Sequence, residues 1–188
     1  RLSLQDGDML TLEISAPLAA RAAIFDVDGT LVDSLPAFHM VASRAAAPHG
    51  IAVPPTAIRD ALTTQQVFWE MLLPPEAPRR EALIATMRAD AERMWPDVLR
   101  EHGRIFPGVG ESLRELCARG LRLGIVTAST NGSFQPLRQA NLLRRFGEII
   151  AGKDVKRRKP DPEGLLRCAA ALGVAPEAAV YVGDAPLD

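Results

Sequence analysis

Two aspartates stand two positions apart where an apolar segment of the chain ends. Asp26 and Asp28 follow Ala22–Phe25, which predicts a short buried strand, and Gly29 and Thr30 come directly after Asp28 and predict the turn that ends it. Side chains two apart in a strand share a face, so the two carboxylates are expected to lie together. At about 4 Å and an effective dielectric constant of about 20 they would repel by about 4 kcal/mol, which argues against a purely stabilising role. The pair therefore indicates chemistry that involves a cation, although aspartate and glycine are also ordinary turn residues.

Later segments also end in polar or charged side chains. A second predicted strand ends in the hydroxyl of Thr127, and a third opens into Gly-Asp at Asp184. Lys159, followed by Pro-Asp-Pro, lies between them, and Asp188 follows four residues after Asp184. Read in order, the chain presents a carboxylate pair, a hydroxyl, a lysine and further carboxylates.

The elements around these residues predict an α/β protein. From residue 104 onward, predicted strands and helices alternate, which favours a parallel sheet covered by helices on both faces. In open sheets of this type ligands bind outside the carboxyl ends of the strands, where Asp26, Thr127 and Asp184 each stand. The predicted strands cover residues 22–25, 121–127, 148–151 and 179–182, and the predicted helices cover 111–119, 133–140 and 162–172.

The segment between Asp28 and residue 104 has a different pattern. Apolar residues recur at helical spacing and prolines separate the runs, which predicts a helical bundle inserted after the first strand. Its helices are expected at residues 36–47, 56–62, 65–73 and 76–102. Before the first strand, alternation over residues 9–15 predicts an additional half-buried strand.

With these segments in this order, the chain resembles the haloacid dehalogenase superfamily of phosphatases and phosphomutases. The resemblance spans about residues 22–188, nearly the whole chain. It implies an α/β fold with a three-layer, Rossmann-like parallel sheet core and an inserted α-helical cap domain. The implied division is residues 1–20 as an N-terminal extension or linker, 21–34 and 104–188 as the core, and 35–103 as the cap. Members of the superfamily continue for another strand or two and a helix, so this chain is expected to be a fragment, a domain of a longer protein, or its ordered part.

The resemblance implies a phosphoryl-transfer site with Mg2+ as cofactor. Asp26 is implied to be the nucleophile and a metal ligand, and to form an aspartyl-phosphate. Asp28 is implied to be the general acid and then the general base, with its backbone carbonyl facing the metal. That role needs a raised pKa, which crowding by neighbouring carboxylates would produce. Asp184 is implied to supply a second carboxylate to the metal, in keeping with the oxygen ligands that Mg2+ prefers.

Other motif residues are implied to support this site. Thr127 would donate a hydrogen bond to the phosphoryl oxygens, and Lys159 would offset charge on the phosphoryl group and on Asp26. The implied supporting residues are Asp188, Gly29 and Thr30. From the residues alone two alternatives stay open: an ordinary β-branched strand position for Thr127, and a solvated basic loop over residues 156–159 for Lys159.

Substrate choice is expected to reside in the cap. Residues 59–65 fall where relatives often carry a glycine-containing loop that reaches the active site, and a threonine replaces that glycine here. The candidate substrate contacts are Arg59, Thr63, Thr64 and Gln65 from the cap, and Ala128 and Ser129 from the segment after Thr127. The alternative for the cap segment is a simple turn between helices, capped by threonine.

Asp28 discriminates among the reactions of the superfamily. Dehalogenases generally lack this second aspartate, and phosphonatases use a cap lysine, whereas no lysine lies between Asp28 and Arg104. The implied function is Mg2+-dependent hydrolysis of a small-molecule phosphate monoester, of the phosphoglycolate phosphatase-like type. One alternative is a β-phosphoglucomutase-like sugar phosphomutase, although Phe38 stands where many mutase-type members carry histidine. An alternative of a different class is a truncated, non-catalytic domain that binds a phosphorylated metabolite or a protein.

Composition agrees with an enzyme that acts on a small phosphorylated metabolite. A formal net charge of -1 argues against nucleic acid or a membrane surface as partner. No apolar run approaches the roughly 18 residues of a membrane span. Cys117 and Cys168 are the only cysteines and predict reduced thiols in a cytoplasmic protein. The expected assembly is a monomer or a homodimer.

Overall fold

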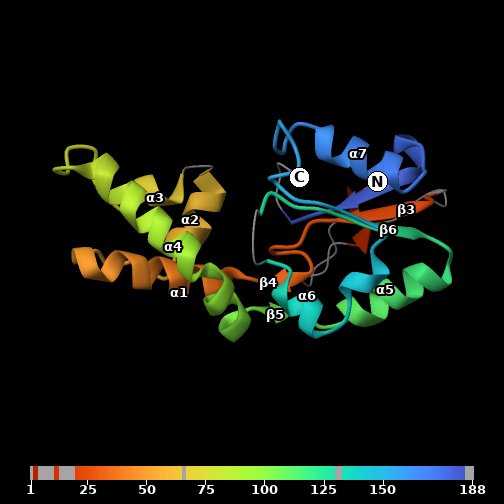
Figure 1. The fold of residues 1–188 in the computed structure, drawn as a ribbon, viewed down its shortest axis with the longest axis horizontal. Helices are drawn as coiled ribbons and strands as arrows, with labels where there is room; N and C mark the ends of the chain where they lie inside the picture. The colour runs from red at the N-terminus through yellow and green to blue at the C-terminus, as the bar shows by residue number, and fades with distance from the viewer. Residues whose placement is uncertain (1, 4–10, 13–19, 65–66, 130–132, 185–188) are drawn as a thin grey trace.

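Two groups of elements make up the molecule: a parallel sheet with helices on both faces, and a group of helices beside it (Figure 1). The computed structural model describes residues 2–3, 11–12, 20–64, 67–129 and 133–184. The first group carries the strand ends that the sequence singles out, so its architecture decides where the candidate site lies.

Within the described residues, a four-stranded parallel sheet forms the centre of the larger group. Its strand order is β7 (Glu148–Ile150), β6 (Arg122–Val126), β3 (Ala22–Phe25), β8 (Ala179–Val182). β3 pairs with both neighbours, so Ala23 lies opposite Leu123 on one side and Val180 on the other. All residues of β3 are buried, which explains a continuous apolar run instead of an alternating one. The predicted α/β fold with a parallel sheet is confirmed.

Helices cover both faces of this sheet. They are α7 (Glu163–Ala171), α5 (Val109–Ala118) and α6 (Gln135–Gln139). α7 lies on one face, and α5 and α6 lie on the other (Figure 1). Ala22 and Ile24 of β3 pack into the core on the α7 side, whereas Ala23 and Phe25 pack into the core that α5 shares. The central strand therefore contributes to both cores, and the predicted three layers are present.

The smaller group, called the helical group below, comprises the helices of residues 35–102. They are α1 (Leu35–Ala46), α2 (Ala57–Thr64), α3 (Phe68–Met71) and α4 (Arg80–His102). α1 packs along α4 (Figure 1), and Val41 and Leu99 are buried in the shared core. Edge-to-face contacts join Phe38 to Phe68 and Trp95, with ring centroids 5.2 and 6.1 Å apart. No helix among the described residues is both long and apolar enough to cross a membrane.

A short antiparallel ribbon joins the helical group to the sheet. β4 (Val32–Asp33) leads into α1, and β5 (Arg104–Ile105) follows α4. Val32 lies opposite Ile105 in this ribbon. The boundaries predicted after residue 34 and before residue 104 fall at its ends, and the assignment of residues 35–103 as a cap stays a prediction.

Several element boundaries differ from the sequence prediction. The helix predicted from residue 76 begins at Arg80, because the prolines at positions 74, 75 and 78 disfavour helix before it. The helix predicted over residues 65–73 is described only as the single turn of α3. Near the N-terminus, β1 (Leu2–Ser3) pairs antiparallel with β2 (Thr11–Leu12), so the described part of the strand predicted over residues 9–15 is extended.

Gly124 in β6 lets α7 lie close to the sheet. A Cβ atom at this position would lie 2.5 Å from Sγ of Cys168 and 3.1 Å from Cδ1 of Leu172. Because a packed core tolerates little added volume, we expect Gly124→Ala to lower the free energy of unfolding by about 1–3 kcal/mol, measured by urea titration.

Gly110→Ala in α5 is the matched control, since nothing lies within 4 Å of its Cβ position and alanine favours a helix over glycine. This change should leave stability unchanged or slightly higher. In a double-mutant cycle, Cys168→Ala should offset part of the loss from Gly124→Ala. Strictly additive effects of the two changes would contradict the close packing.

Candidate active site

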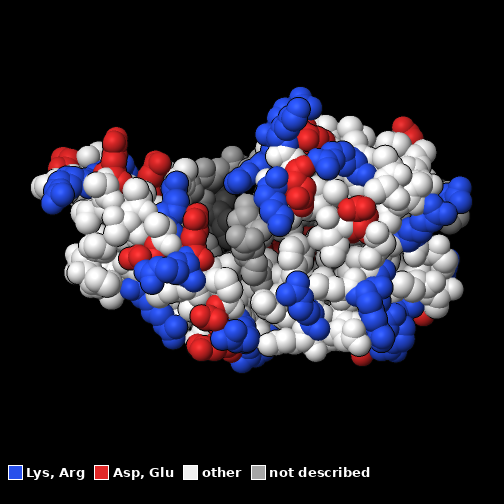
Figure 2. Space-filling model, viewed as in Figure 1, with Lys and Arg blue, Asp and Glu red and all other residues white. Residues whose placement is uncertain are grey.

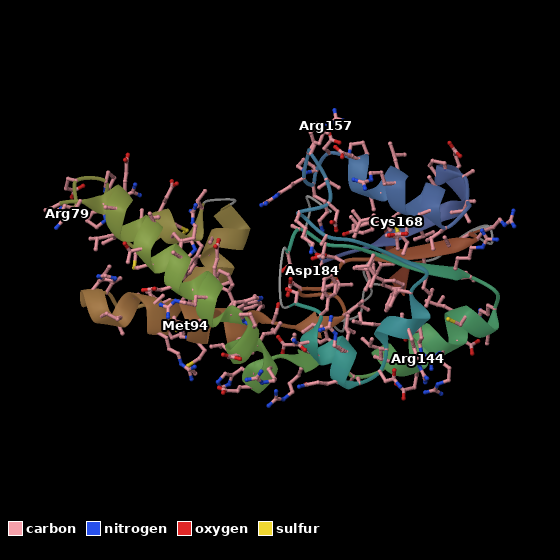
Figure 3. All side chains as sticks on the ribbon, in the orientation of Figure 1. Arg79, Met94, Arg144, Arg157, Cys168 and Asp184 are labelled. Carbon is pink, nitrogen blue, oxygen red and sulfur yellow. The ribbon has the colours of Figure 1, made fainter. Side chains whose placement is uncertain are left out.

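The carboxyl ends of the strands bring the motif residues to one edge of the sheet. Asp26 directly follows β3, Thr127 directly follows β6, and Asp184 lies just after β8. Lys159 reaches the same edge from the loop between β7 and α7, with Nζ 3.2 Å from Oδ2 of Asp26. Figure 3 shows Asp184 at the end of the sheet nearest the helical group. The structure therefore assembles the residues that the sequence analysis placed at strand ends.

Lys159 is enclosed by the site, with 13% of its side chain exposed. Its ammonium donates a hydrogen bond to the Tyr181 hydroxyl at 2.8 Å and lies 5.4 Å from the centre of the tyrosine ring. The same hydroxyl donates to the backbone carbonyl of Val126 at 3.2 Å. Arg157 and Arg158 of the same basic run are exposed, and Figure 2 shows Lys and Arg side chains gathered over this loop. A solvated basic loop thus describes the neighbours of Lys159 and not Lys159 itself.

The turn after Asp28 is shaped around Asp184. Gly29 has a φ of 80°, in the left-handed region that favours glycine. A Cβ atom at Gly29 would lie 2.5 Å from Cγ of Asp184, so the absence of a side chain lets this carboxylate approach. Thr30 Oγ1 donates to Oδ1 of Asp184 at 3.2 Å. The two predicted supporting residues of this turn therefore lie against Asp184.

Asp28 is half-buried beside two serines that the sequence analysis did not select. Ser133 donates to Oδ2 of Asp28 at 2.9 Å, and the Ser34 hydroxyl also hydrogen-bonds this carboxylate. Burial raises the pKa of Asp28 above its ordinary value and Asp184 adds to the rise, while the two serines and Lys159 oppose it. The predicted direction is correct, but the main cause is burial and not crowding by other carboxylates.

The segment after β6 lies against the connection between β7 and α7. Thr127 is buried, and its Oγ1 accepts a hydrogen bond from the backbone N–H of Ser129 at 3.2 Å. Gly152 packs against the backbone of Ala128, and its amide donates to the carbonyl of Ser129 at 3.1 Å. Thr127, Ala128 and Lys159 line one small pocket. Thr127 therefore lies at the same edge as Lys159, and its hydrogen bond to the phosphoryl oxygens stays a prediction.

The predicted contacts from the helical group fall in or next to α2. Because α2 runs to Thr64, residues Arg59, Thr63 and Thr64 lie on a helix and not in the simple turn considered as the alternative. Gln65 and Asp188 lie outside the described residues. The proposed part of these residues in substrate or metal binding stays a prediction.

Residues 23–188 match the family model described as haloacid dehalogenase-like hydrolase. The chain belongs to this family. The match begins within β3 and takes in the entire edge of the sheet described above, so the predicted family is confirmed.

Relatives of this hydrolase fall in the branch that the sequence predicted. The chain is 31% identical over 192 residues to the phosphoglycolate phosphatase of Escherichia coli strain K12, covering 89% of this chain and 75% of that protein. A provisionally named phosphoglycolate phosphatase from Lactobacillus plantarum has a similar structure, with a TM-score of 0.73 and 28% identity over 89% of this chain and 79% of that one. A provisionally named β-phosphoglucomutase from Thermotoga maritima gives a TM-score of 0.60 and 26% identity over 86% and 74% of the two chains.

The carboxylates of this hydrolase suit a hard divalent cation. Asp26, Asp28 and Asp184 supply oxygen donors, and Oδ1 of Asp28 is buried with no hydrogen-bond partner among the described residues. Within the same part of the chain, no three acidic, histidine or cysteine side chains are grouped closely enough to enclose a metal ion. A few carboxylates that do not enclose the ion are compatible with Mg2+, because Mg2+ binds one or two carboxylates and completes its coordination with water and substrate oxygens.

Replacing Tyr181 by phenylalanine tests the support of Lys159. Tyr181→Phe keeps the aromatic ring and removes the hydroxyl that accepts from the lysine. We expect kcat/KM of the hydrolase to fall about tenfold, as for the loss of one hydrogen bond to a charged group, with the fold retained by circular dichroism. An unchanged kcat/KM would show that Lys159 stays beside Asp26 without the hydroxyl.

Replacing Asp28 by asparagine tests its raised pKa. The folded protein binds the Asp28 proton more tightly than the unfolded chain, so ionisation lowers wild-type stability as pH rises above the ordinary pKa of 3.8. An amide does not ionise, so the stability of Asp28→Asn relative to wild type is expected to increase as the pH rises above about 4. Chemical denaturation in the presence of a chelator measures this difference, and a difference that is constant or falls with pH would contradict the raised pKa.

Proposed function

We propose that this hydrolase cleaves a small phosphate monoester, with Mg2+, through an aspartyl-phosphate on Asp26. The observation that carries the proposal is the contact of 3.2 Å between Oδ2 of Asp26 and Nζ of Lys159, next to the half-buried Asp28 with its raised pKa. A nucleophile, a cationic group and a proton donor at one edge are what phosphoryl transfer to a carboxylate needs. The identity of 31% to a phosphoglycolate phosphatase supports a substrate of that class.

In the first step, a carboxylate oxygen of Asp26 attacks phosphorus. A new bond forms between this oxygen and phosphorus while the ester P–O bond breaks, and the proton of Asp28 passes to the departing oxygen to give the alcohol. The raised pKa of Asp28 keeps more of this carboxyl protonated near neutral pH than in an ordinary aspartate. Lys159 offsets charge between Asp26 and the phosphoryl oxygens, and Thr127 donates a hydrogen bond to those oxygens.

In the second step, water releases inorganic phosphate. Asp28, now ionised, takes a proton from a water molecule whose oxygen bonds to phosphorus, while the bond between phosphorus and Asp26 breaks. The carboxylate of Asp26 is regenerated and Asp28 is protonated again. Lys159, held by Tyr181, stabilises the departing carboxylate because it lies beside Asp26 throughout.

Asp26, Asp184 and the backbone carbonyl of Asp28 are the proposed ligands of Mg2+, with Asp188 in support. When bound, the ion supplies positive charge to the phosphoryl oxygens. The turn at Gly29 and Thr30 serves this site because it holds the Asp184 carboxylate against the segment that carries Asp28.

The helical group is the proposed cap, which would choose the substrate. The β4–β5 ribbon attaches it beside the site, and Asp28 itself forms an isolated bridge with Val32 of this ribbon. The predicted substrate contacts remain Arg59, Thr63, Thr64 and Gln65 from the cap, and Ala128 and Ser129 from the core.

A phosphomutase is the second candidate, supported by the similarity to the Thermotoga maritima protein. One position of the helical group favours hydrolysis instead. Phe38, where many mutases carry histidine, packs against Phe68 and Trp95. The phenylalanine side chain at position 38 has no donor or acceptor that could bind a sugar hydroxyl.

A phosphate-release screen tests the proposed function. Wild-type protein is assayed with Mg2+ on small esters that include 2-phosphoglycolate and hexose phosphates. We expect release of inorganic phosphate, loss of activity with a chelator, and a fall in kcat of at least about a thousandfold in Asp26→Asn, which removes the nucleophile. Asp97→Asn on the exposed side of α4 is the matched control and should behave as wild type.

Each alternative has its own outcome in this screen. Activity that survives Asp26→Asn would reject the aspartyl-phosphate, and activity that survives chelation would reject Mg2+. Conversion of a hexose 1-phosphate to the 6-phosphate without net release of phosphate would select the mutase. A folded wild-type protein that is inert towards every ester would select the non-catalytic binding domain.

A further inference from the structure

A row of hydrogen-bonded residues connects the end of β6 to the Asp28 carboxylate. Ser133 is completely buried, just before α6, although it lies 105 residues from Asp28 in the sequence. Its Oγ is 2.9 Å from Oδ2 of Asp28 and 2.6 Å from Oγ of Ser129. The backbone N–H of Ser129 in turn donates to Oγ1 of Thr127 at 3.2 Å. Three hydroxyl-bearing residues therefore join the candidate phosphate-binding segment to the candidate acid.

The direction of each hydrogen bond along this row follows from the single proton that each serine hydroxyl can donate. Whether Asp28 is ionised or protonated on Oδ1, its Oδ2 accepts, so Ser133 gives its one hydroxyl proton to this oxygen. Ser129 must then be the donor in the bond between the two serines. Both hydroxyls thus point along the row towards Asp28.

A purely structural role for the Ser133 hydroxyl is poorly supported by its contacts. Serines near the start of a helix commonly cap it, but the N-cap residue of α6 is Phe134, and no side chain caps this helix. The Ser133 hydroxyl instead hydrogen-bonds the side chains of Asp28 and Ser129. A buried hydroxyl aimed at a reacting group orients that group.

We propose that Ser133 is a positioning residue that holds the Asp28 carboxyl in line with the departing oxygen of the substrate. The inference rests on the proposed function, in which Asp28 is the proton donor. A proton donor has to lie within hydrogen-bond reach of the atom that it protonates, and small displacements of such a group lower rates steeply. Ser133 fixes one carboxylate oxygen from the α6 side, while Ser34 contacts the same carboxylate from the start of α1.

Substrates with different leaving groups distinguish a role of Ser133 in positioning the acid from a general loss of activity. An alkoxide leaves poorly without a proton, whereas p-nitrophenolate leaves as a stable anion. kcat/KM reports only steps up to formation of the aspartyl-phosphate, so the hydrolysis step that all substrates share does not enter. We expect Ser133→Ala to lower kcat/KM for an alkyl phosphate such as 2-phosphoglycolate by about 10–100-fold and for p-nitrophenyl phosphate by less than about threefold.

Two further variants test whether the effect of Ser133→Ala passes through Asp28 and depends on the lost hydroxyl. In an Asp28→Ala background, Ser133→Ala should cause no additional loss on the alkyl phosphate, because its effect passes through Asp28. Ser133→Cys keeps the side-chain volume with a weak donor and should show the same selectivity, which also covers the case of an unfolded alanine variant. Ser112→Ala on the exposed side of α5 is the control and should match wild type on both substrates.

The outcomes distinguish this inference from the proposed function. Equal losses on both substrates, no loss on either, or a further loss in the Asp28→Ala background would overturn the positioning role of Ser133 while leaving the phosphatase proposal intact. A wild-type protein without phosphatase activity, or an Asp26→Asn variant that keeps it, would overturn the proposed function and this inference with it.

Discussion

The burial of carboxylates at one edge of the sheet is the constraint on which the rest of the site depends. Each carboxylate is met by a donor from a different part of the chain. The donors are Lys159 for Asp26, Ser133 for Asp28 and Thr30 for Asp184. Asp26 is buried and Asp28 is half-buried, and charges withdrawn from water are stable only with such compensation, because the protein around them replaces the water that would otherwise solvate them. The residues that support the donors, above all Tyr181, are therefore as much a part of the site as the acids.

The strand ends were predictable from the sequence for a simple physical reason. Asp26 and Thr127 directly follow apolar runs that can only be buried strands, and parallel strands end at a common edge. The place of Lys159 in the site was harder to predict, since a run of basic residues usually lies in solvent. Its distinction from Arg158 comes from the path of the loop, which turns Lys159 inward and leaves its neighbour exposed.

Ser133 and Tyr181 could not be selected from the sequence. The ordinary interpretation of a tyrosine in a strand is packing, and the partners of its hydroxyl come from two other elements. A serine before a short helix has the ordinary interpretation of a cap, and its contact with Asp28 depends on how the segment after β6 folds back. The cause of the raised pKa of Asp28 was misjudged for the same reason: spacing shows which charges are near in sequence, but burial follows from packing.

The ribbon of β4 and β5 has a mechanical consequence. Two paired strands resist twisting more than a single linker does, and they leave bending across the ribbon as the easier motion. The chain passes from Asp26 into the ribbon within a few residues, and Asp28 bridges to Val32 at its start. Asp28, the proposed proton donor, thus lies next to the point about which the helical group would swing. Displacement is smallest near such a point, so a swing of the helices would move Asp28 less than any residue of the helical group.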